Sequence, residues 1–153
     1  MGQESQLWDY GCSLWENTHI RDSFLKLQDE DGINPLLVMA ASWLASRQIK
    51  LNSVRIAELS NRISPWNDQV VKPLRNARRF ARVQGQHKLA DDIAQAELDA
   101  EKKVLQWLQD ATSSWKKTEA GALLEKNLAI TAEFYDLPHH PTWSELEQWI
   151  SQC

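Results

Sequence analysis

Cysteine is scarce in this chain of 153 residues, which holds only Cys12 and Cys153. Two cysteines so far apart form neither a zinc site nor a CxxC redox motif. A chain of this length buries roughly 70% of the surface that its unfolded form exposes, so it folds without a metal or a disulfide. We therefore expect two free thiols in a reducing compartment.

Signature motifs of catalysis are also absent from the sequence. It has no GxSxG, no glycine-rich phosphate loop and no Cys-His signature. Asp91 and Asp92 are followed by IAQA, so the second aspartates of a DDxxD motif are missing. The histidines show no HExxH spacing; they are His19, His87, His139 and His140. We expect no catalytic residues, no bound metal and no cofactor.

The chain also lacks an excess of positive charge and a long apolar run. Its net charge of -4 argues against non-specific nucleic-acid binding. The first residues, MGQESQLWDY, show no basic region followed by an apolar core, so we expect no secretory signal. The most apolar run, 36–45, is shorter than the roughly 20 residues that span a bilayer. We expect a cytoplasmic protein without membrane contact.

The most informative stretch that is present reads LKLQDEDGINPLLVMAASWLASRQIKL, from Leu25 to Leu51. Gly32 suits the left-handed backbone that ends a helix. Asn34 can cap the next helix, and Pro35 at its first position loses only an N–H that has no helical partner. Because the residues that follow are apolar on all sides, we expect 35–48 to be a buried central helix.

Apolar residues elsewhere repeat at steps of three and four, and no segment alternates as a strand does. We expect an all-α single domain over 1–153, an irregular or orthogonal bundle of about seven helices around the 35–48 helix. Ser64 with Pro65 predicts a new helix start. Thr142 with Glu145 predicts a capping box. The other expected helices cover 5–17, 18–28, 53–63, 66–83, 87–110, 119–135 and a last short one from 142.

An acidic turn, 29–31, precedes the central helix. It does not fit a calcium loop, because Leu27 and Val38 would occupy the first and last ligand positions. The sequence predicts instead that Asp29 and Asp31 are solvated or pair with a basic surface.

The segment 66–83, WNDQVVKPLRNARRFARV, carries most of the positive charge. From 62 to 88 seven basic residues and one acid give +6, so the rest of the chain carries -10. Pro73 must either kink this helix or begin a new one after an irregular step. On a regular helix one face is apolar, with Val70, Leu74, Ala77 and Ala81. The basic side chains lie opposite; they are Lys72, Arg75, Arg78, Arg79 and Arg82.

Two hypotheses for function follow. Arginine suits bidentate recognition of carboxylate or phosphate. The first hypothesis is a non-enzymatic interaction or adaptor protein that binds an acidic protein, a nucleic acid or a phosphorylated ligand through Arg75, Arg78, Arg79 and Arg82. Alternatively, these side chains are solvated or pair internally with Asp29 and Asp31. The second hypothesis is a small-molecule binder or enzyme with a helix-lined pocket. Its walls would include some of the eight tryptophans.

Three pieces of the chain resemble a family of uncharacterised bacterial proteins of the gammaproteobacterial type. They are the early tryptophan helix, LQDEDGINPLLVMAASWLA at 27–45 and WNDQVVKPLRNARR at 66–79. Pro35 and Leu36 depart from the Val-Asn that the family more often places there. The resemblance covers the first hundred residues well. It implies an all-helical, soluble protein and supplies no activity and no active site.

Overall fold

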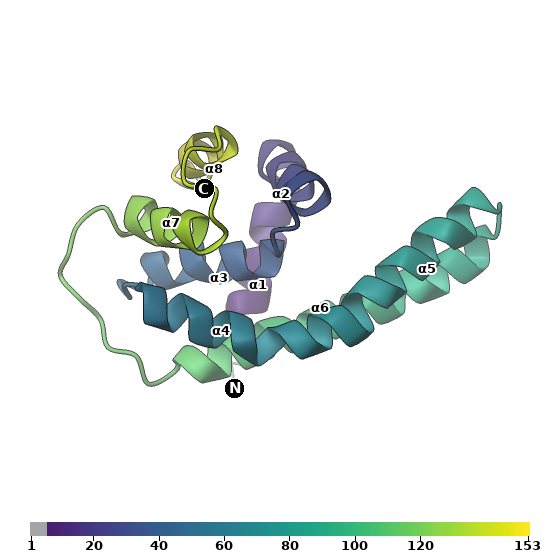
Figure 1. Cartoon of the computed structure of the whole chain (residues 1–153), viewed down its shortest axis with the longest axis horizontal. Coiled ribbons are helices and arrows are strands. Elements are labelled where there is room, and N and C mark those ends of the chain that lie inside the picture. The colour runs from purple at the N-terminus through teal and green to yellow at the C-terminus, as the bar shows by residue number, and fades with distance from the viewer. Residues whose placement is uncertain (1–5) are drawn as a thin grey trace.

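The computed structural model describes residues 6–153, and every regular element among them is helical (Figure 1). The first five residues lie outside the described part, and the expectations about a secretory signal and a helix start at 5 fall partly on them. The elements are α1 (Gln6–Glu16), α2 (Thr18–Asp31), α3 (Pro35–Ser46), α4 (Ser53–Trp66), the π-helical η2 (Asn67–Val71), α5 (Lys72–Val83), α6 (His87–Thr112), α7 (Leu123–Phe134) and α8 (Thr142–Ile150). The predicted all-α class is confirmed.

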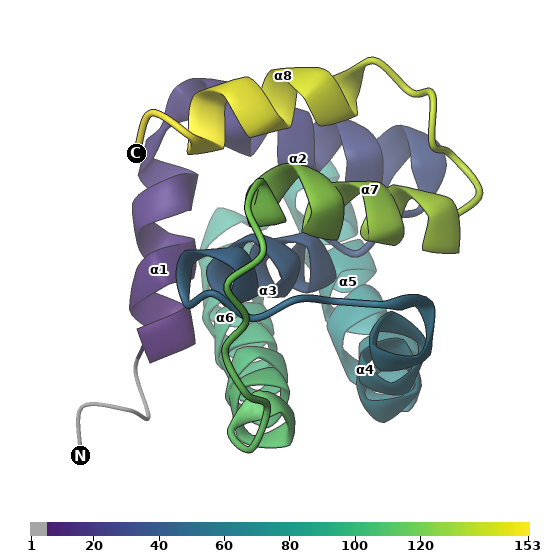
Figure 2. The ribbon, with the colours of Figure 1, turned by 90° about the vertical axis from the view of Figure 1, so that its left-hand side faces the viewer.

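Helix α3 is the buried centre of the fold, as the sequence predicts. Gly32 ends α2 with a φ of 67°, and the Asn34 side chain accepts a hydrogen bond of 3.0 Å from the N–H of Leu36. All residues from Pro35 to Ala45 are buried. Helices α1, α2, α6 and α7 pack around α3 (Figure 2). A wholly apolar helix is stable here because its neighbours cover every side.

The predicted helix start at Ser64 and Pro65 is wrong. Helix α4 runs through Pro65 to Trp66, and the Ser64 hydroxyl donates to the carbonyl of Ser60 at 2.6 Å. A serine whose hydroxyl bonds back into its own helix does not cap a new one. The Pro65 ring lies on the exposed side of α4, where the carbonyl that loses a helical donor can meet water.

Pro73 begins α5 after an irregular step, which is the π-helical turn η2. The N–H of Lys72 donates to the carbonyl of Asn67, five residues back. Helix α4, η2 and α5 therefore follow one another without a break. A π-turn holds one residue more than an α-turn and widens the backbone ahead of the proline ring. At 3.6 residues per turn, that residue rotates everything after it by about 100°.

The buried face of α5 agrees only in part with the predicted one. Ala81 is buried and Val70 and Leu74 pack against the core as predicted, whereas Ala77 is exposed. Arg75 and Arg78 were predicted on the opposite face, but they face α6, where Glu97 accepts hydrogen bonds from both. The prediction is wrong for these two residues, because the carboxylate that holds them belongs to another helix.

Helices α5 and α6 form an antiparallel hairpin that extends away from the other helices (Figure 1). Gly85, with a φ of 76°, lies in the turn between them. At the base of the hairpin the indole N–H of Trp66 donates to the carbonyl of Ala100 at 3.1 Å. Trp107 packs edge-on against Trp66 with ring centroids 5.2 Å apart. No helix in residues 6–153 combines the length and the apolar character needed to cross a bilayer.

The C-terminal helices cover the other side of α3. Helix α7 packs on α3, and α8 lies over α2 and α7 (Figure 2). The capping box predicted at Thr142 does not form. Thr142 Oγ1 is buried without a hydrogen-bond partner in the described part of the chain, and the N–H of Thr142 donates instead to Nδ1 of His140 at 3.2 Å. Thr142 is the first residue of the helix and its side chain turns into the core instead of back along the backbone.

The side chain of Asn127 joins α7 to the centre of the fold by hydrogen bonds. Its side chain is fully buried and donates to the carbonyls of Ala41 at 3.1 Å and Ile49 at 3.0 Å. Its carbonyl oxygen accepts from the N–H of Leu51 at 2.9 Å. The bonds with Ile49 and Leu51 satisfy backbone groups that lie outside any helix, so the amide holds the α3–α4 connection in place.

We predict that Asn127→Ala lowers the free energy of unfolding by about 2 to 4 kcal/mol, because it leaves buried backbone groups unpaired. Urea unfolding followed by circular dichroism measures the change. The matched control is Asn61→Ala at an exposed position of α4, where we expect about 0.5 kcal/mol or less. Equal effects of the two substitutions would contradict the role given to Asn127.

Candidate functional site: a cleft under the helical hairpin

A cleft of about 480 Å³ lies between the hairpin and helices α1, α2 and α3. This volume is within the range of roughly 300 to 1,000 Å³ that is usual for small-molecule sites. Most of its lining is apolar. The large apolar side chains in its wall are Trp8, Trp15, Leu25, Leu36, Met39, Leu98 and Leu105. Three consecutive helices, α1 to α3, and the distant helix α6 thus supply one apolar surface.

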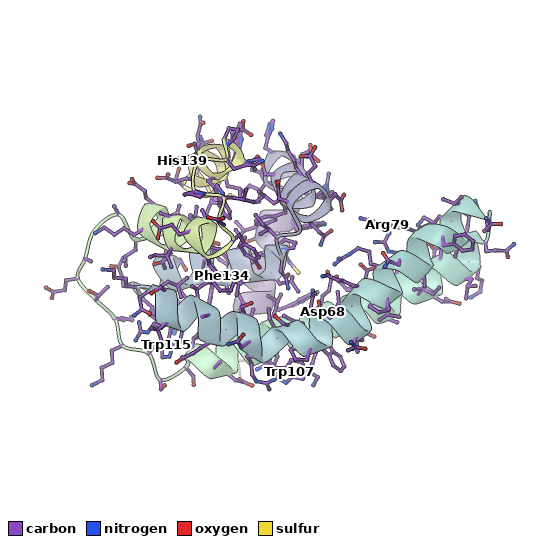
Figure 3. All side chains as sticks on the ribbon, viewed as in Figure 1. Asp68, Arg79, Trp107, Trp115, Phe134 and His139 are labelled. Atoms are coloured by element: carbon purple, nitrogen blue, oxygen red, sulfur yellow. The ribbon has the colours of Figure 1, made fainter. Side chains whose placement is uncertain are left out.

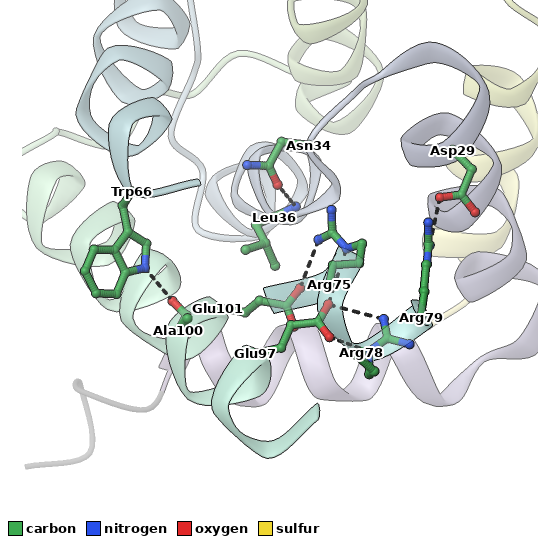
Figure 4. Close-up of polar contacts among 10 residues, drawn as sticks. All are labelled: Asp29, Asn34, Leu36, Trp66, Arg75, Arg78, Arg79, Glu97, Ala100 and Glu101. Atoms are coloured by element: carbon green, nitrogen blue, oxygen red, sulfur yellow. Dashed lines mark hydrogen bonds and ion pairs between the residues drawn. The ribbon is translucent and has the colours of Figure 1, made fainter. Parts of the chain in front are cut away.

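A buried carboxylate joins the two helices of the hairpin beside this cleft (Figure 4). Glu97 Oε1 accepts a hydrogen bond of 2.5 Å from Arg78 Nε, and Oε2 accepts one of 3.3 Å from Arg75 Nε. The side chain of Glu97 is 8% exposed and that of Arg75 is 11% exposed. Hydrogen bonding to Glu97 raises the pKa of Arg78. An ionised carboxylate is tolerated at this depth because two guanidinium groups replace its water.

Glu101 lies one turn further along α6 and is held more loosely. Its Oε2 is 3.7 Å from Arg75 NH2, beyond hydrogen-bond length. Burial, and then the negative charge of Glu97, raise the pKa of Glu101 from 4.5 to about 7, although Arg75 and Arg78 oppose the shift. Near neutral pH this carboxyl group is thus shared between its charged and protonated forms.

The structure places the predicted site residues in two groups. Arg75, Arg78 and Arg79 line the cleft, whereas Arg82 lies nearer the hairpin tip and pairs with Asp91 at 3.1 Å. Arg79 reaches toward the body of the protein and pairs with Asp29 of α2 at 3.0 Å (Figures 3 and 4).

Asp31, the other acidic residue predicted as a counterpart, lies apart from the arginines. Its Oδ2 is 3.1 Å from Nε2 of His140, in the connection between α7 and α8. The acidic residues 29–31, predicted to form a turn after a helix at 18–28, lie instead in the last turn of α2. There Asp29 meets Arg79 of the hairpin and Asp31 meets His140 near the C-terminus.

Glu97 and Glu101 are the site residues that sequence reasoning missed. One signal was available for Glu97, which stands four residues after Ile93 and three before Ala100, inside the apolar stripe of α6. A charged residue within such a stripe is buried with a partner or faces a site. No comparable signal identifies Glu101, whose role depends on Arg75.

Helix α1 closes the cleft on its far side. A Cβ on Gly11 would lie 3.1 Å from Met39 Sδ and 3.6 Å from Leu105 Cδ1, so a glycine lets α1 approach closely. Cys12 also lines the cleft. Burial, with the charges of Asp9 and Glu16, raises the pKa of its thiol. The thiol is thus neutral near pH 7 and a weak nucleophile.

Two other observations concern a metal ion and a second cavity. No group of three or more side chains suited to a metal ion occurs among residues 6–153. A larger cavity, of about 670 Å³, lies between α1 and the loop before α7, and Tyr10, Ser42 and Leu124 line it. No basic side chain from the described residues contributes to its wall. The cleft under the hairpin is therefore the better candidate for an anionic ligand.

We predict that Glu97→Gln destabilises the protein by about 2 to 3 kcal/mol, because it leaves two buried guanidinium groups short of negative charge. Chemical denaturation measures the loss. The matched control is Glu58→Gln at an exposed site of α4, where the unfolding midpoint should hardly move. An unchanged midpoint for Glu97→Gln would show that the buried pairing contributes nothing to stability.

We predict a pH-dependent effect for Glu101→Gln. Because the folded-state pKa of Glu101 is raised from 4.5 to about 7, the folded protein binds the proton more tightly than the unfolded chain does. The stability that this proton contributes is present at low pH and is lost as the pH rises through about 7. The stability of the variant relative to the wild type should increase by about 2 kcal/mol from about pH 5 to about pH 8. Glu125→Gln, exposed on α7, is the control and should give a constant difference.

Comparison with known proteins gives one result. No curated protein and no solved structure matches the chain. A family described as a protein of unknown function (DUF2390) matches residues 6–108. The matched range contains every residue that lines the cleft, from Trp8 to Leu105. It also confirms the resemblance to an uncharacterised family that the sequence indicated. The chain belongs to the DUF2390 family, and the function of that family is not known.

Proposed function

We propose that this protein binds an anionic ligand with an apolar body in the cleft under the hairpin. The observation that supports the proposal is the presence of three arginines, Arg75, Arg78 and Arg79, in a cleft whose lining is otherwise mostly apolar. Apolar walls with a few convergent polar groups are typical of small-molecule sites. The arginines would orient the charged group, and the walls would take up the rest of the molecule.

The arginines retain hydrogen-bonding capacity for such a ligand. Arg75 uses Nε and NH2 toward Glu97 and Glu101, and Arg78 uses Nε and NH2 toward Glu97. Arg79 uses NH2 toward Asp29. The NH1 groups of all three have no partner among residues 6–153, and guanidinium groups bind planar anions well.

The depth of the arginines favours a small ligand over a flat protein surface. The side chains of Arg75 and Arg78 are 11% and 24% exposed, respectively, so a protein docking on the hairpin would reach mainly Arg79 and Arg82. The adaptor hypothesis therefore ranks second to the pocket hypothesis. We also propose the cytoplasm as the setting, because Cys12 and Cys153 are both free thiols.

We predict that anilinonaphthalene sulfonate, an apolar fluorescent anion, binds the cleft. Two matched pairs test this. Leu98 and Leu89 are both exposed on α6, but only Leu98 lines the cleft, so Leu98→Asn should weaken binding about fivefold to tenfold and Leu89→Asn should not. Arg79 and Arg82 are about equally exposed on α5, and only Arg79→Ala should weaken binding. Fluorescence titration measures the dissociation constants. Equal effects within both pairs would exclude the cleft as the site.

A further inference from the structure

The wall of the cleft differs chemically from one end to the other. Its wall on α6 runs from Ala94 to Leu105, which is roughly 16 Å at 1.5 Å per residue. The end at Leu105 meets Met39 and Gly11 and is apolar. The other end, toward the hairpin, carries the arginines. A ligand that matches both ends is extended, with an apolar chain and one charged head.

The charge at the basic end matches a single negative charge. Arg75 and Arg78 supply two positive charges, and Glu97 neutralises one of them. Glu101 neutralises part of the other, because its pKa is raised to about 7. Arg79 is already paired with Asp29. Glu16 also lines the cleft but is exposed to solvent. The excess among the buried groups is thus between zero and one positive charge, which a monoanion balances and a phosphate dianion exceeds.

Arg75 faces the carboxylate of Glu101, which it holds only loosely. Glu97 is bound within hydrogen-bond length by both arginines, but Glu101 is 3.7 Å from Arg75 and makes no hydrogen bond to it. A ligand carboxylate that reaches Nη1 and Nη2 of Arg75 within hydrogen-bond length can displace Glu101 at little cost in free energy. Because the Glu101 carboxylate lies at this position, the guanidinium of Arg75 is placed to pair with a carboxylate there.

We infer that the ligand is an aliphatic monocarboxylate whose carboxylate replaces Glu101 at Arg75 while its chain lies along Leu98, Leu105 and Met39. This inference rests on the proposed function and names its ligand class. When the ligand takes Arg75, Glu101 loses its counter-ion beside Glu97 and takes up a proton from solvent. The proton forms an O–H bond on the Glu101 carboxylate, and no other covalent bond is made or broken. One proton enters the site for each ligand bound above neutral pH.

The charged groups around Glu101 come from four helices. Helix α5 presents Arg75 and Arg78, and α6 itself presents Glu97, which both arginines bind. Helix α2 contributes Asp29, which pairs with Arg79. Helix α1 contributes Glu16, which is exposed, and the thiol of Cys12, whose pKa is raised by burial. Helix α3 carries no ionisable side chain between Pro35 and Ser46. Of these groups, Glu101 is the carboxyl group that lies beside Arg75 without a hydrogen bond to it, so we assign the proton to Glu101.

The experiment is a calorimetric titration of the full chain with decanoate below its micelle concentration, from about pH 6.5 to about pH 8.5, where the ligand stays ionised. We expect the dissociation constant to rise by up to about tenfold per pH unit above pH 7, as uptake of one proton requires. In Glu101→Gln the affinity should exceed that of the wild type at high pH and should no longer depend on pH. Equal pH dependence in the variant would overturn the inference.

Head-group analogues separate this inference from the proposed function. Decanol and decyltrimethylammonium should bind at least about tenfold more weakly than decanoate. Tighter binding of decyl phosphate, or equal binding of decanol, would overturn the carboxylate assignment and leave an amphiphile site in place. Failure of all decyl compounds and of the fluorescent sulfonate would overturn both proposals.

Cys12 provides an independent readout of location. In a Cys153→Ser background Cys12 is the only cysteine, and it lines the cleft. Alkylation with N-ethylmaleimide, followed by intact mass, should slow when decanoate is present. An unchanged alkylation rate at saturating decanoate would place the ligand elsewhere and overturn the inference.

Discussion

The structure of the hairpin depends on one buried carboxylate. Glu97 lies between α5 and α6 and is bound by the guanidinium groups of Arg75 and Arg78. Such a cluster adds little net stability over an apolar core, because desolvation offsets the attraction. Its effect is on geometry, since each charge can be buried only while the others are in position. The hairpin therefore has one register, and that register places basic groups at the edge of an apolar cleft.

The cleft becomes a site through the meeting of elements that are far apart in the chain. Helix α1 contributes Trp8 and Cys12, α3 contributes Leu36 and Met39, and the hairpin contributes the charges. All of them fall within the residues that the family matches, 6–108. The lining of the cleft is thus assembled within the part of the chain that the family covers.

Much of the fold was predictable from local patterns. Gly32, Asn34 and Pro35 identify the boundary of α2 and α3, and the apolar run that follows identifies the central helix. Local signals failed where tertiary packing decided the outcome. Pro65 stays within α4, and Thr142 turns inward instead of capping α8. For the site, Arg75, Arg78 and Arg79 were recognisable by type, but the sequence placed all three on the face of the helix opposite the apolar one. Their carboxylate partners on α6 were not predictable without the hairpin pairing.

The π-turn at Asn67–Val71 gives this site an unusual form of sensitivity, because it sets the rotational phase of α5. The turn holds one residue more than an α-turn, so each side chain of α5 lies about 100° from where a regular continuation of α4 would carry it. If the turn changed to an α-turn without loss of a residue, α5 would rotate by about 100°, Arg75 and Arg78 would leave Glu97, and that carboxylate would be buried without a counter-ion. The side chains of the cleft would be unchanged in sequence but no longer brought together. The arrangement of the cleft thus depends on the type of turn between α4 and α5 as well as on the residues that line it.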